Sequence, residues 1–515
     1  MHTEPPPAAG TGNTPSRDLD RSLIRGIAWT GGAKWLTQII SWVATPIIAS
    51  LLNPGDYGVA AMAMVYVGLV QLVTEFGIGT AIVQRRELGD DQVARLGGIS
   101  VLLGAFFAAV SIALAPLVAR FFGNPDVKPV VIVLSTMFLA SSFQTLPRAL
   151  LTRDLNFRRL AALDTLEALS AIAVTLPLAV LGFRHWALVL GAITGRVAST
   201  ILALLWRGHR LAWPTDLATI SGPVAFGSHV VGSSIAWYTF LNADLAIVGR
   251  RLGSIALGSY SIGLSLASIP VDRLSALVSR VTPAILAKVQ HDRPALRRYV
   301  LALTEGTALL TFPVAVGLAL VAEEFVLVVL GDKWRAAIIP LRLLALAAVF
   351  RSVVPLFSQI LNATGESKRN MKATIATALV LVPLFYIASE RGTGGVALVW
   401  LIAYPIVVAI FSMRYAFAAC DMRLGLYLRA LWPAASATLV MAAVVLVVAL
   451  LGSGRWSLPI LLGTKCVVGA ATYIGLVWYV HGGRFRRSFA MVREPPAAPE
   501  GPLFEQPLPP AGVRM

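Results

Sequence analysis

Long apolar segments separated by short polar or basic stretches follow one another along almost the whole chain. A helix of about 20 apolar residues spans the hydrocarbon core of a bilayer. The pattern predicts an all-α integral membrane protein with about 14 transmembrane helices. The predicted spans are 28–51, 57–80, 97–119, 128–150, 160–182, 186–206, 223–249, 257–285, 299–329, 336–362, 372–389, 394–418, 428–451 and 457–481.

The predicted spans divide into two sets of six and a final pair. We expect an N-lobe at 21–210, a C-lobe at 221–418 and two further helices at 428–481. An internal repeat supports this division, because "SLLNPGDYGVA" aligns with "RRLGSIALGSY" at an offset of 200, which matches Leu52 with Leu252 and Gly58 with Gly258. Six is an even number, so both copies start on the same side of the membrane, and the repeat predicts a pseudo-twofold axis along the membrane normal.

Composition and charge support the membrane assignment and orient the chain. The chain is 57% hydrophobic and 13% charged, whereas soluble domains carry about a quarter charged residues. Its net charge of +17 comes mostly from short loops, where 26 Lys and Arg residues fall on one side of the predicted membrane and 9 on the other. The positive-inside rule then places both termini in the cytoplasm, with basic residues facing membrane lipids rather than nucleic acid. We expect the protein to lie in the inner membrane.

Several classes of chemistry have no signature in the sequence. The ends, 1–20 and 484–515, are rich in proline and read as disordered cytoplasmic tails. Cys420 and Cys466 form no CxxC pair, which argues against a metal site or disulfide. No phosphate-binding loop, HExxH or GxSxG motif is present, so we expect neither an enzyme nor a bound cofactor.

Polar residues interrupt the apolar pattern on particular helix faces. Charges inside a membrane usually face a bundle interior or an aqueous cavity. In the orientation above, the cations Lys34, Arg273 and Arg280 and the carboxylate Glu75 all fall in the cytoplasmic half. Such a basic layer suits an anionic substrate, because arginine binds phosphate oxygens bidentately and lysine supplies a point charge. The serines along 261–279 suit a hydroxyl-rich cargo.

Structural explanations of these residues stay open beside the functional one. A row of serines also lets helices pack closely. Lys34 and Arg280 can reach the membrane interface with their long side chains, and Asp272 or Glu75 can neutralise Arg273. A further group of charges is predicted to pair within the lobes: Glu167, Arg196, Glu305, Arg342 and Arg351.

Three motifs taken together, "NPGDYG", "FGIGTAIVQ" and "RDLNF", resemble a known family. They are similar to the Wzx-type lipopolysaccharide and exopolysaccharide flippases, especially the colanic-acid exporters, in the polysaccharide-transport branch of the multidrug/oligosaccharidyl-lipid/polysaccharide flippase superfamily. The resemblance implies a V-shaped bundle of two six-helix lobes plus two helices. It also implies alternating access for an undecaprenyl-pyrophosphate-linked oligosaccharide, moved from the inner to the outer leaflet for surface polysaccharide synthesis.

The resemblance also suggests roles for the polar residues. Lys34, Arg273 and Arg280 would hold the pyrophosphate, while Glu75, Asp244 and Asp272 would balance charge or respond to a proton or sodium gradient. The expected partners besides the lipid-linked oligosaccharide are a polysaccharide polymerase and glycosyltransferases. The residues expected to line the cavity and contact sugar are Gln38, Ser41, Tyr238, Asn242, Ser265, Ser268 and Ser275.

Three other functions would leave signatures different from those of a flippase. A cation-coupled multidrug antiporter of the same superfamily would show a cavity dominated by carboxylates, whereas the predicted inner layer is basic. A membrane-bound oligosaccharide polymerase or ligase would need a large outward loop with acid/base residues, which the spacing of the spans does not allow. A non-transporting scaffold would bind neutral and pyrophosphate lipids equally weakly.

Overall fold

The protein is a bundle of helices. The computed structural model describes residues 37–38, 40–84, 88–213 and 218–493, which form helices and short turns, with no strand in these ranges. After the helical stretch Ile40–Leu51, the helices up to the middle of the chain are α2 (Pro54–Gln84), α3 (Asp90–Phe122), α4 (Val127–Leu134), α5 (Thr136–Arg153), α6 (Phe157–Val180), α7 (His185–Arg207) and α8 (Ala218–Val289).

The second half of the chain is also helical, with several interruptions. Its elements are α9 (Arg293–Leu320), α10 (Ala322–Phe325), the π-helix η1 (Val326–Leu330), the 3₁₀-helix η2 (Asp332–Ala337), α11 (Ile338–Val353), α12 (Pro355–Ala363), α13 (Ser367–Ala388), the 3₁₀-helix η3 (Ser389–Arg391), α14 (Gly392–Leu398), the π-helix η4 (Val399–Ala403), α15 (Tyr404–Val408), the π-helix η5 (Ala409–Met413), α16 (Arg414–Ala419), α17 (Leu424–Gly452) and α18 (Leu458–Arg493).

The lengths and apolar composition of these helices make the chain a multi-pass membrane protein. Ten helical stretches among the described residues are long and apolar enough to cross a membrane. The predicted spans 128–150 and 336–362 each consist of two helices, which meet at Ser135 and at Val354. At the second of these, Pro355 lacks a backbone N–H and its ring crowds the preceding turn, so one helix ends and another begins.

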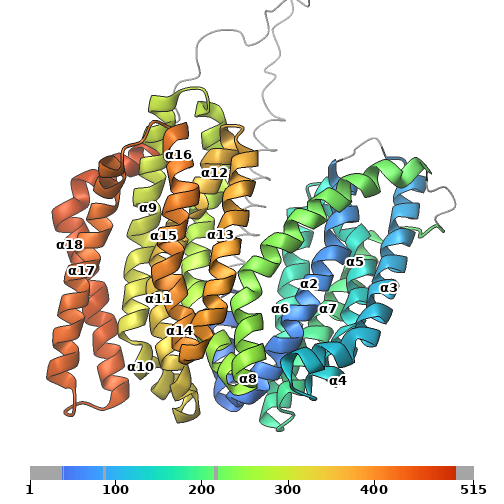
Figure 1. The fold of residues 1–515 in the computed structure, drawn as a ribbon, viewed down its shortest axis with the longest axis horizontal. Coiled ribbons are helices and arrows are strands. Elements are labelled where there is room, and N and C mark those ends of the chain that lie inside the picture. The colour runs from blue at the N-terminus through green and yellow to red at the C-terminus, as the bar shows by residue number, and fades with distance from the viewer. Residues whose placement is uncertain (1–36, 39, 85–87, 214–217, 494–515) are drawn as a thin grey trace, which may run out of the picture.

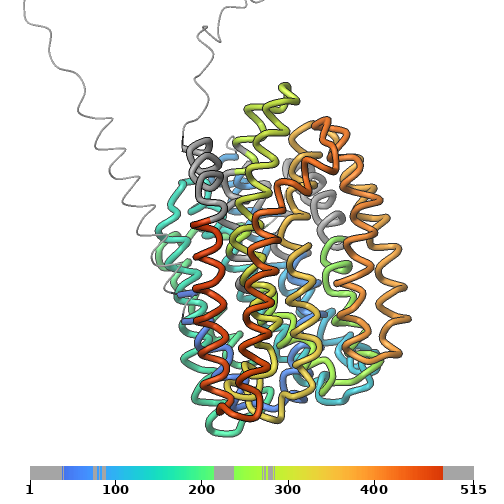
Figure 2. The backbone as a smooth tube through the Cα atoms, turned by 90° about the vertical axis from the view of Figure 1, so that its left-hand side faces the viewer, coloured from blue at the N-terminus to red at the C-terminus, as the bar shows by residue number. Residues whose placement is uncertain are grey.

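The helices form two bundles with a pair at one edge. Figure 1 shows α2 to α7 in an N-terminal bundle and α9 to α16, with the second half of α8, in a C-terminal bundle. The bundles meet at the end where α8 turns and diverge toward the opposite end. Figure 2 shows α17 and α18 side by side along the outer face of the C-terminal bundle. This is the V-shaped arrangement that the sequence resemblance predicts.

The turn within α8 lies at Gly253, between the predicted spans 223–249 and 257–285. Gly253 has φ 84° and ψ −177°, a conformation that a side chain disfavours and glycine adopts readily. The turn reverses the direction of the chain, so the first half of α8 approaches the N-terminal bundle and the second half enters the C-terminal one.

Where the bundles meet, α2 and α8 make two reciprocal contacts. A Cβ atom added to Gly58 would lie 1.8 Å from the carbonyl oxygen of Ser254, and one added to Gly258 would lie 1.7 Å from that of Pro54. Each contact therefore requires glycine. Because 54 pairs with 254 and 58 with 258 at the repeat offset of 200, the two contacts are related by the predicted internal symmetry. We call this region, defined by these four residues, the contact end.

Two further contacts join the bundles at the contact end. Trp334 of η2 is fully buried, and its indole Nε1–H donates to the carbonyl of Ala49 at 2.8 Å. On the other side, the Arg250 guanidinium donates to the carbonyl oxygens of Arg120 and Phe121, at 3.2 and 2.6 Å. These carbonyls lie in the last turn of α3, where backbone acceptors have no partner within the helix.

Candidate functional site

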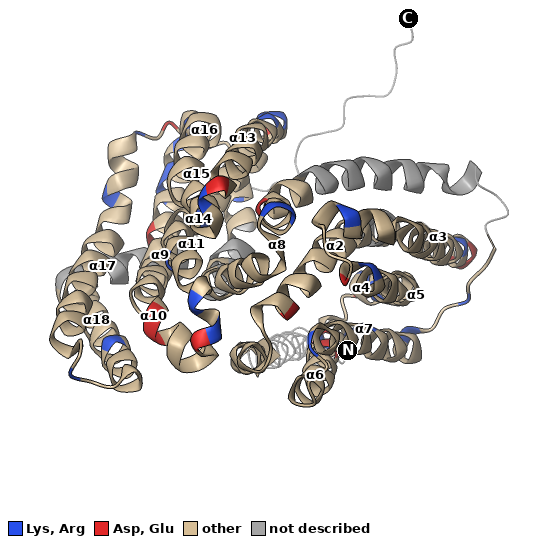
Figure 3. Cartoon of the chain, turned by 60° about the horizontal axis from the view of Figure 1, so that its bottom comes forward, with Lys and Arg blue, Asp and Glu red and all other residues tan. Residues whose placement is uncertain are grey.

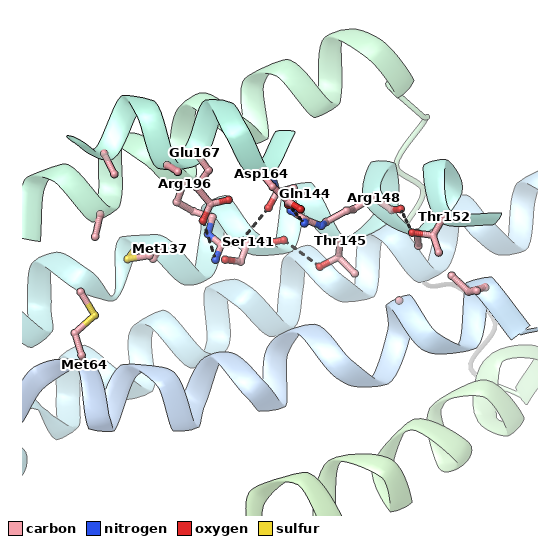
Figure 4. Close-up of a pocket in the computed structure, with 16 residues that line it drawn as sticks. Met64, Met137, Ser141, Gln144, Thr145, Arg148, Thr152, Asp164, Glu167 and Arg196 are labelled. Carbon is pink, nitrogen blue, oxygen red and sulfur yellow. Dashed lines mark hydrogen bonds and ion pairs between the residues drawn. The ribbon is translucent and has the colours of Figure 1, made fainter. Parts of the chain in front are cut away.

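A cavity of about 1050 Å³ lies within the N-terminal bundle, between α2, α5, α6 and α7. Figure 4 shows it extending from Met64 and Met137 toward Arg148 and Thr152. Its lining residues are Met64, Gly79, Val83, Met137, Ser141, Gln144, Thr145, Arg148, Ala149, Thr152, Asp164, Glu167, Ala168, Ala171, Ala192 and Arg196. We call it the N-terminal cavity.

Helix α6 supplies two carboxylates to this cavity. Asp164 and Glu167 are three residues apart, so they lie on the same face of the helix. Arg148 of α5 forms an ion pair with Asp164, and Arg196 of α7 forms one with Glu167 at 3.3 Å. The arginines thus approach α6 from the helices on either side. The second pair confirms that Glu167 and Arg196 interact within their lobe.

Gln144 fixes the position of Arg196 at the middle of the cavity. Its side-chain oxygen accepts from Arg196 Nη1 at 3.0 Å, and its Nε2 donates to Ser199 Oγ at 2.6 Å. The orientation of the amide follows from these two bonds, since only the oxygen can accept from a guanidinium. Arg196 is therefore held between Gln144 and Glu167, with its charge directed along the cavity wall.

The charged residues of the cavity remain partly accessible although they lie between membrane-spanning helices. The side chains of Arg148 and Asp164 are 35% and 39% exposed, and those of Arg196 and Glu167 are 16% and 28% exposed. Charged side chains at this depth face a bundle interior or water rather than lipid. Figure 3 shows where charged residues lie along the described helices of both bundles. The cavity therefore holds two cations that are matched by two carboxylates, within a lining that is otherwise largely apolar.

A second polar cluster surrounds Asp244, where the first half of α8 meets the C-terminal bundle. Asp244 is fully buried and accepts three hydrogen bonds, from Tyr260 Oη at 2.7 Å, Trp400 Nε1 at 2.8 Å and the backbone N–H of Leu245 at 2.8 Å. The Arg351 guanidinium lies 5.1 Å from the centroid of the Trp400 ring and brings a positive charge close to the carboxylate. Trp400 belongs to the π-helix η4, and such interruptions are frequent at functional sites.

The cations predicted to hold a pyrophosphate are not described by the structure. Lys34 lies outside the described residues. Helices α2 and α8 carry Glu75, Asp272, Arg273 and Arg280, but the placement of these side chains also lies outside the described part of the chain. Their meeting in one chamber stays a prediction.

The predicted polar residues that the structure does describe divide between the two bundles. Tyr238 of α8 reaches across to α2, where its hydroxyl donates to the carbonyl of Val65 at 3.3 Å, and Asn242 donates to the carbonyl of Tyr238. In the C-terminal bundle, Ser268 accepts a hydrogen bond from Arg351 Nη1 at 3.1 Å, while Asp244 lies in the buried cluster described above.

The remaining predicted positions are partly exposed. Ser41 donates its hydroxyl hydrogen to the carbonyl of Thr37, one turn earlier, and Gln38 lies on the same helical stretch. Ser265 and Ser275 are half-buried on α8. The roles of these residues in binding sugar stay predictions.

Sequence reasoning did not place Arg148, Asp164 or Gln144 in a functional site. Arg148 lies near one end of the predicted span 128–150, where a basic residue is common, and Asp164 lies inside the predicted span 160–182. A signal was present, since Asp164 and Glu167 are the acidic residues of the span 160–182 and share one face. Their arginine partners come from two other helices, so the pairing depends on how the helices pack.

Comparison with known proteins identifies related sequences. The profile of a family described as "Polysaccharide biosynthesis protein" matches residues 47–339. The lipopolysaccharide biosynthesis protein WzxC of Escherichia coli is 26% identical over 404 residues, which cover 77% of this chain and 81% of that protein. The succinoglycan biosynthesis transport protein ExoT of Rhizobium meliloti is 24% identical over 490 residues, which cover 93% of this chain and 98% of ExoT.

Solved structures share the same fold at low sequence identity. The lipid II flippase MurJ in an inward closed conformation superimposes with a TM-score of 0.71 at 14% identity, over 90% of this chain and 100% of that structure. An inward-facing multidrug resistance MATE family transporter of the MOP superfamily gives a TM-score of 0.60 at 17% identity, over 75% of this chain and 95% of that structure. The helical architecture is therefore that of known membrane transporters.

Proposed function

Because the chain belongs to the family of polysaccharide biosynthesis proteins, we propose that it is a flippase for a lipid-linked oligosaccharide used in surface polysaccharide synthesis. The proposed substrate is an undecaprenyl-pyrophosphate-linked oligosaccharide, moved from the inner to the outer leaflet of the cytoplasmic membrane. The observation that carries the proposal is the N-terminal cavity, lined by two arginine–carboxylate pairs, inside a membrane-spanning bundle of a family named for polysaccharide biosynthesis. Moving this substrate across requires a water-accessible chamber for its head group, while the polyprenyl tail stays in lipid.

Alternating access fits the arrangement of the two bundles. They touch at the contact end through α2 and α8 and diverge toward the opposite end (Figure 1). The positive-inside rule places the contact end on the outer side of the membrane, with both termini in the cytoplasm. In this orientation the bundles diverge toward the cytoplasm, the side where the substrate is made. Transport then requires the contact end to open and the opposite end to close.

The basic residues of α8 and Lys34 are proposed to hold the pyrophosphate, and a proton or sodium gradient is a candidate energy source. A ligand can drive the change between the two states only by binding them differently. A diphosphate does so if Lys34, Arg273 and Arg280 reach it together in one state alone. A polymerase and glycosyltransferases acting on the same lipid would be the functional partners.

The test is deletion of the gene in its own cells, followed by complementation. Deletion should stop polysaccharide export and cause the lipid-linked oligosaccharide to accumulate on the cytoplasmic leaflet, as measured by its protection from a membrane-impermeant periodate probe. The unchanged gene should restore export, whereas Arg273→Gln and Arg280→Gln should not, at equal protein levels. The control is Arg335→Gln, which removes an exposed arginine at the contact end and should restore export fully.

The alternative is a cation-coupled multidrug antiporter of the same superfamily. It predicts that deletion makes cells sensitive to cationic drugs and leaves polysaccharide export unchanged. That pair of results, or normal export supported by both arginine variants, would contradict the flippase proposal. In the N-terminal cavity each lining carboxylate is paired with an arginine, which does not suit a cationic drug.

A further inference from the structure

The N-terminal cavity presents donor-only and acceptor-only groups side by side. Arginine offers N–H donors and no acceptor, whereas an ionised carboxylate only accepts. Arg148 with Asp164, and Arg196 with Glu167, place both kinds of group along one wall of the cavity (Figure 4). A hydroxyl group both donates and accepts, so a neighbouring pair of hydroxyls on a sugar ring can bond to each kind at once.

We propose that the N-terminal cavity binds the uncharged, hydroxyl-rich sugar portion of the transported lipid, at a site separate from that of the pyrophosphate. This inference rests on the proposed function and names a binding site for one part of its substrate. Glu167 and Asp164 accept hydrogen bonds from sugar hydroxyls, and the arginines and Gln144 donate to them.

Charge is the reason that the pyrophosphate is assigned elsewhere. The lining residues of the cavity carry two positive and two negative side chains, so their formal charge is zero. A pyrophosphate entering it would have to displace Glu167 or Asp164 from an arginine and leave that carboxylate unpaired beside it. Removing the partner of a buried charge is costly, and like charges held together are unfavourable. A sugar that carries a carboxylate meets the same obstacle.

The size and the other lining groups of the cavity suit a sugar chain. Met137 and Thr152 lie 15 positions apart on α5, which corresponds to roughly 22 Å along the helix. Met64 and Met137 border the end of the cavity opposite Thr152, and methionine side chains adapt to irregular ligand surfaces. The cavity is thus elongated, with polar groups along its length and an apolar end.

The experiment measures binding to the purified full chain in lipid nanodiscs by native mass spectrometry. The three probes are undecaprenyl pyrophosphate, the same lipid carrying a neutral hexose trisaccharide, and the same lipid carrying a trisaccharide that contains glucuronate. The test variants are Glu167→Gln and Asp164→Asn. The control is Asp332→Asn, which removes a carboxylate from an exposed ion pair with Arg335. The melting temperature of each variant checks its folding.

We expect the unchanged protein to bind the neutral glycolipid more tightly than either other probe. Losing one charged acceptor should reduce its preference over undecaprenyl pyrophosphate by about tenfold. Undecaprenyl pyrophosphate itself should bind no more weakly in either variant, because each substitution leaves one arginine of the cavity without its carboxylate. Asp332→Asn should keep the full preference. If Glu167→Gln does not fold, Asp164→Asn tests the same proposal at the more exposed pair.

Three results would overturn the sugar site: an unchanged preference in both test variants, equal weakening of all three probes, or tightest binding of the glucuronate lipid by the unchanged protein. These results leave the flippase proposal standing if the unchanged protein still moves the neutral glycolipid across vesicle membranes. Failure of the unchanged protein to bind or move any of the three lipids would instead overturn the proposed function, and the sugar site with it.

Discussion

Asp244 illustrates what a single buried charge requires of its surroundings. It has no contact with water, and its carboxylate accepts hydrogen bonds from Tyr260, Trp400 and the backbone N–H of Leu245. Leaving a buried polar group without a partner costs about 1 to 3 kcal/mol, and more for a charged group. The three donors therefore join both halves of α8 to η4, whose Trp400 lies 156 positions after Asp244.

At the residue scale, we predict that Trp400→Phe destabilises the protein by about 2 kcal/mol, because an aromatic ring remains but the indole donor to Asp244 is lost. The free energy of unfolding of the purified protein in bicelles measures the effect. Trp432→Phe is the matched control, since that indole is 61% exposed on α17. Equal stability of the two variants would show that the bond to Asp244 contributes little.

The sequence indicates which residues are unusual but not what they contact. Asp244 stands out as a carboxylate inside an apolar span, and this made it a candidate for charge balance. Its partner Trp400 lies 156 positions later and reads as an ordinary aromatic residue of another span. Which faces of two helices meet depends on how each helix is rotated about its axis and on the angle at which the helices cross. A single sequence does not reveal either. The same limit explains why Glu167 and Arg196 were predicted to pair within lobes while Arg148 and Asp164 were missed.

Helix α18 is attached to the rest of the protein by a buried ion pair. Lys465 contacts Glu324 of α10, and their side chains are only 6% and 9% exposed. Lys465 also lies 3.5 Å from the carbonyl oxygen of Leu320, at the end of α9. Because α17 and α18 lie on the outer face of the C-terminal bundle (Figure 2), this pair is a specific attachment for the apolar span Leu458–Tyr479 of α18.

At the element scale, we predict that Lys465→Met destabilises the protein by about 3 kcal/mol, because it leaves Glu324 buried without a cation. The double variant Lys465→Met/Glu324→Leu should recover most of the loss, since replacing both partners by apolar groups is often neutral. Unfolding in bicelles and protease cleavage between α17 and α18 measure both effects. Arg335→Met, in an exposed ion pair, should change neither. A double variant as unstable as the single one would contradict this explanation.

The sequence predicts where the helices lie better than it predicts where they are interrupted. Runs of apolar residues predicted the positions of the spans, because the bilayer requires a minimum apolar length. They did not predict that the span 394–418 contains two π-helical turns, at η4 and η5. A π turn changes only the hydrogen-bonding register of the backbone, so an apolar run gives no sign of it. Gly253 was easier, because a glycine between two long apolar runs is a typical turn position.

At the scale of the whole molecule, the contact end determines which side of the protein is closed. The two bundles meet there through backbone contacts at Gly58 and Gly258 and through the side chains of Trp334 and Arg250. A rigid-body movement of one bundle against the other must break all of these contacts. Holding them together should therefore stop transport without affecting the binding of the substrate.

We predict that a disulfide between Gly55→Cys and Ile255→Cys locks the protein. A Cβ added to Gly55 would lie 3.6 Å from Cγ1 of Ile255, so side chains at the two positions touch and two cysteine sulfurs there can approach each other. Oxidation should abolish transport of the lipid-linked oligosaccharide in vesicles, and a reducing agent should restore it. Each single cysteine variant is a control and should transport equally well in both conditions. Full transport by the oxidised double variant would show that the contact end does not open.

The native thiols interfere little with this experiment. Burial raises the pKa of the Cys420 thiol to about 11, so at neutral pH it stays protonated and unreactive. Cys466 is exposed on α18 and should be replaced by serine in every variant.

The paired glycine contacts have a consequence for how the protein changes state. Each glycine contact places the backbone of one helix directly against the backbone of the other. No side chain lies between them that could change its rotamer and keep the contact when the helices separate slightly. Internal symmetry makes the two contacts equivalent. A tilt of one bundle that separates the backbones at one contact therefore strains the other contact, unless both contacts separate at the same time. We therefore expect the two contacts to form or break together, so that a half-open contact end would be rarely populated.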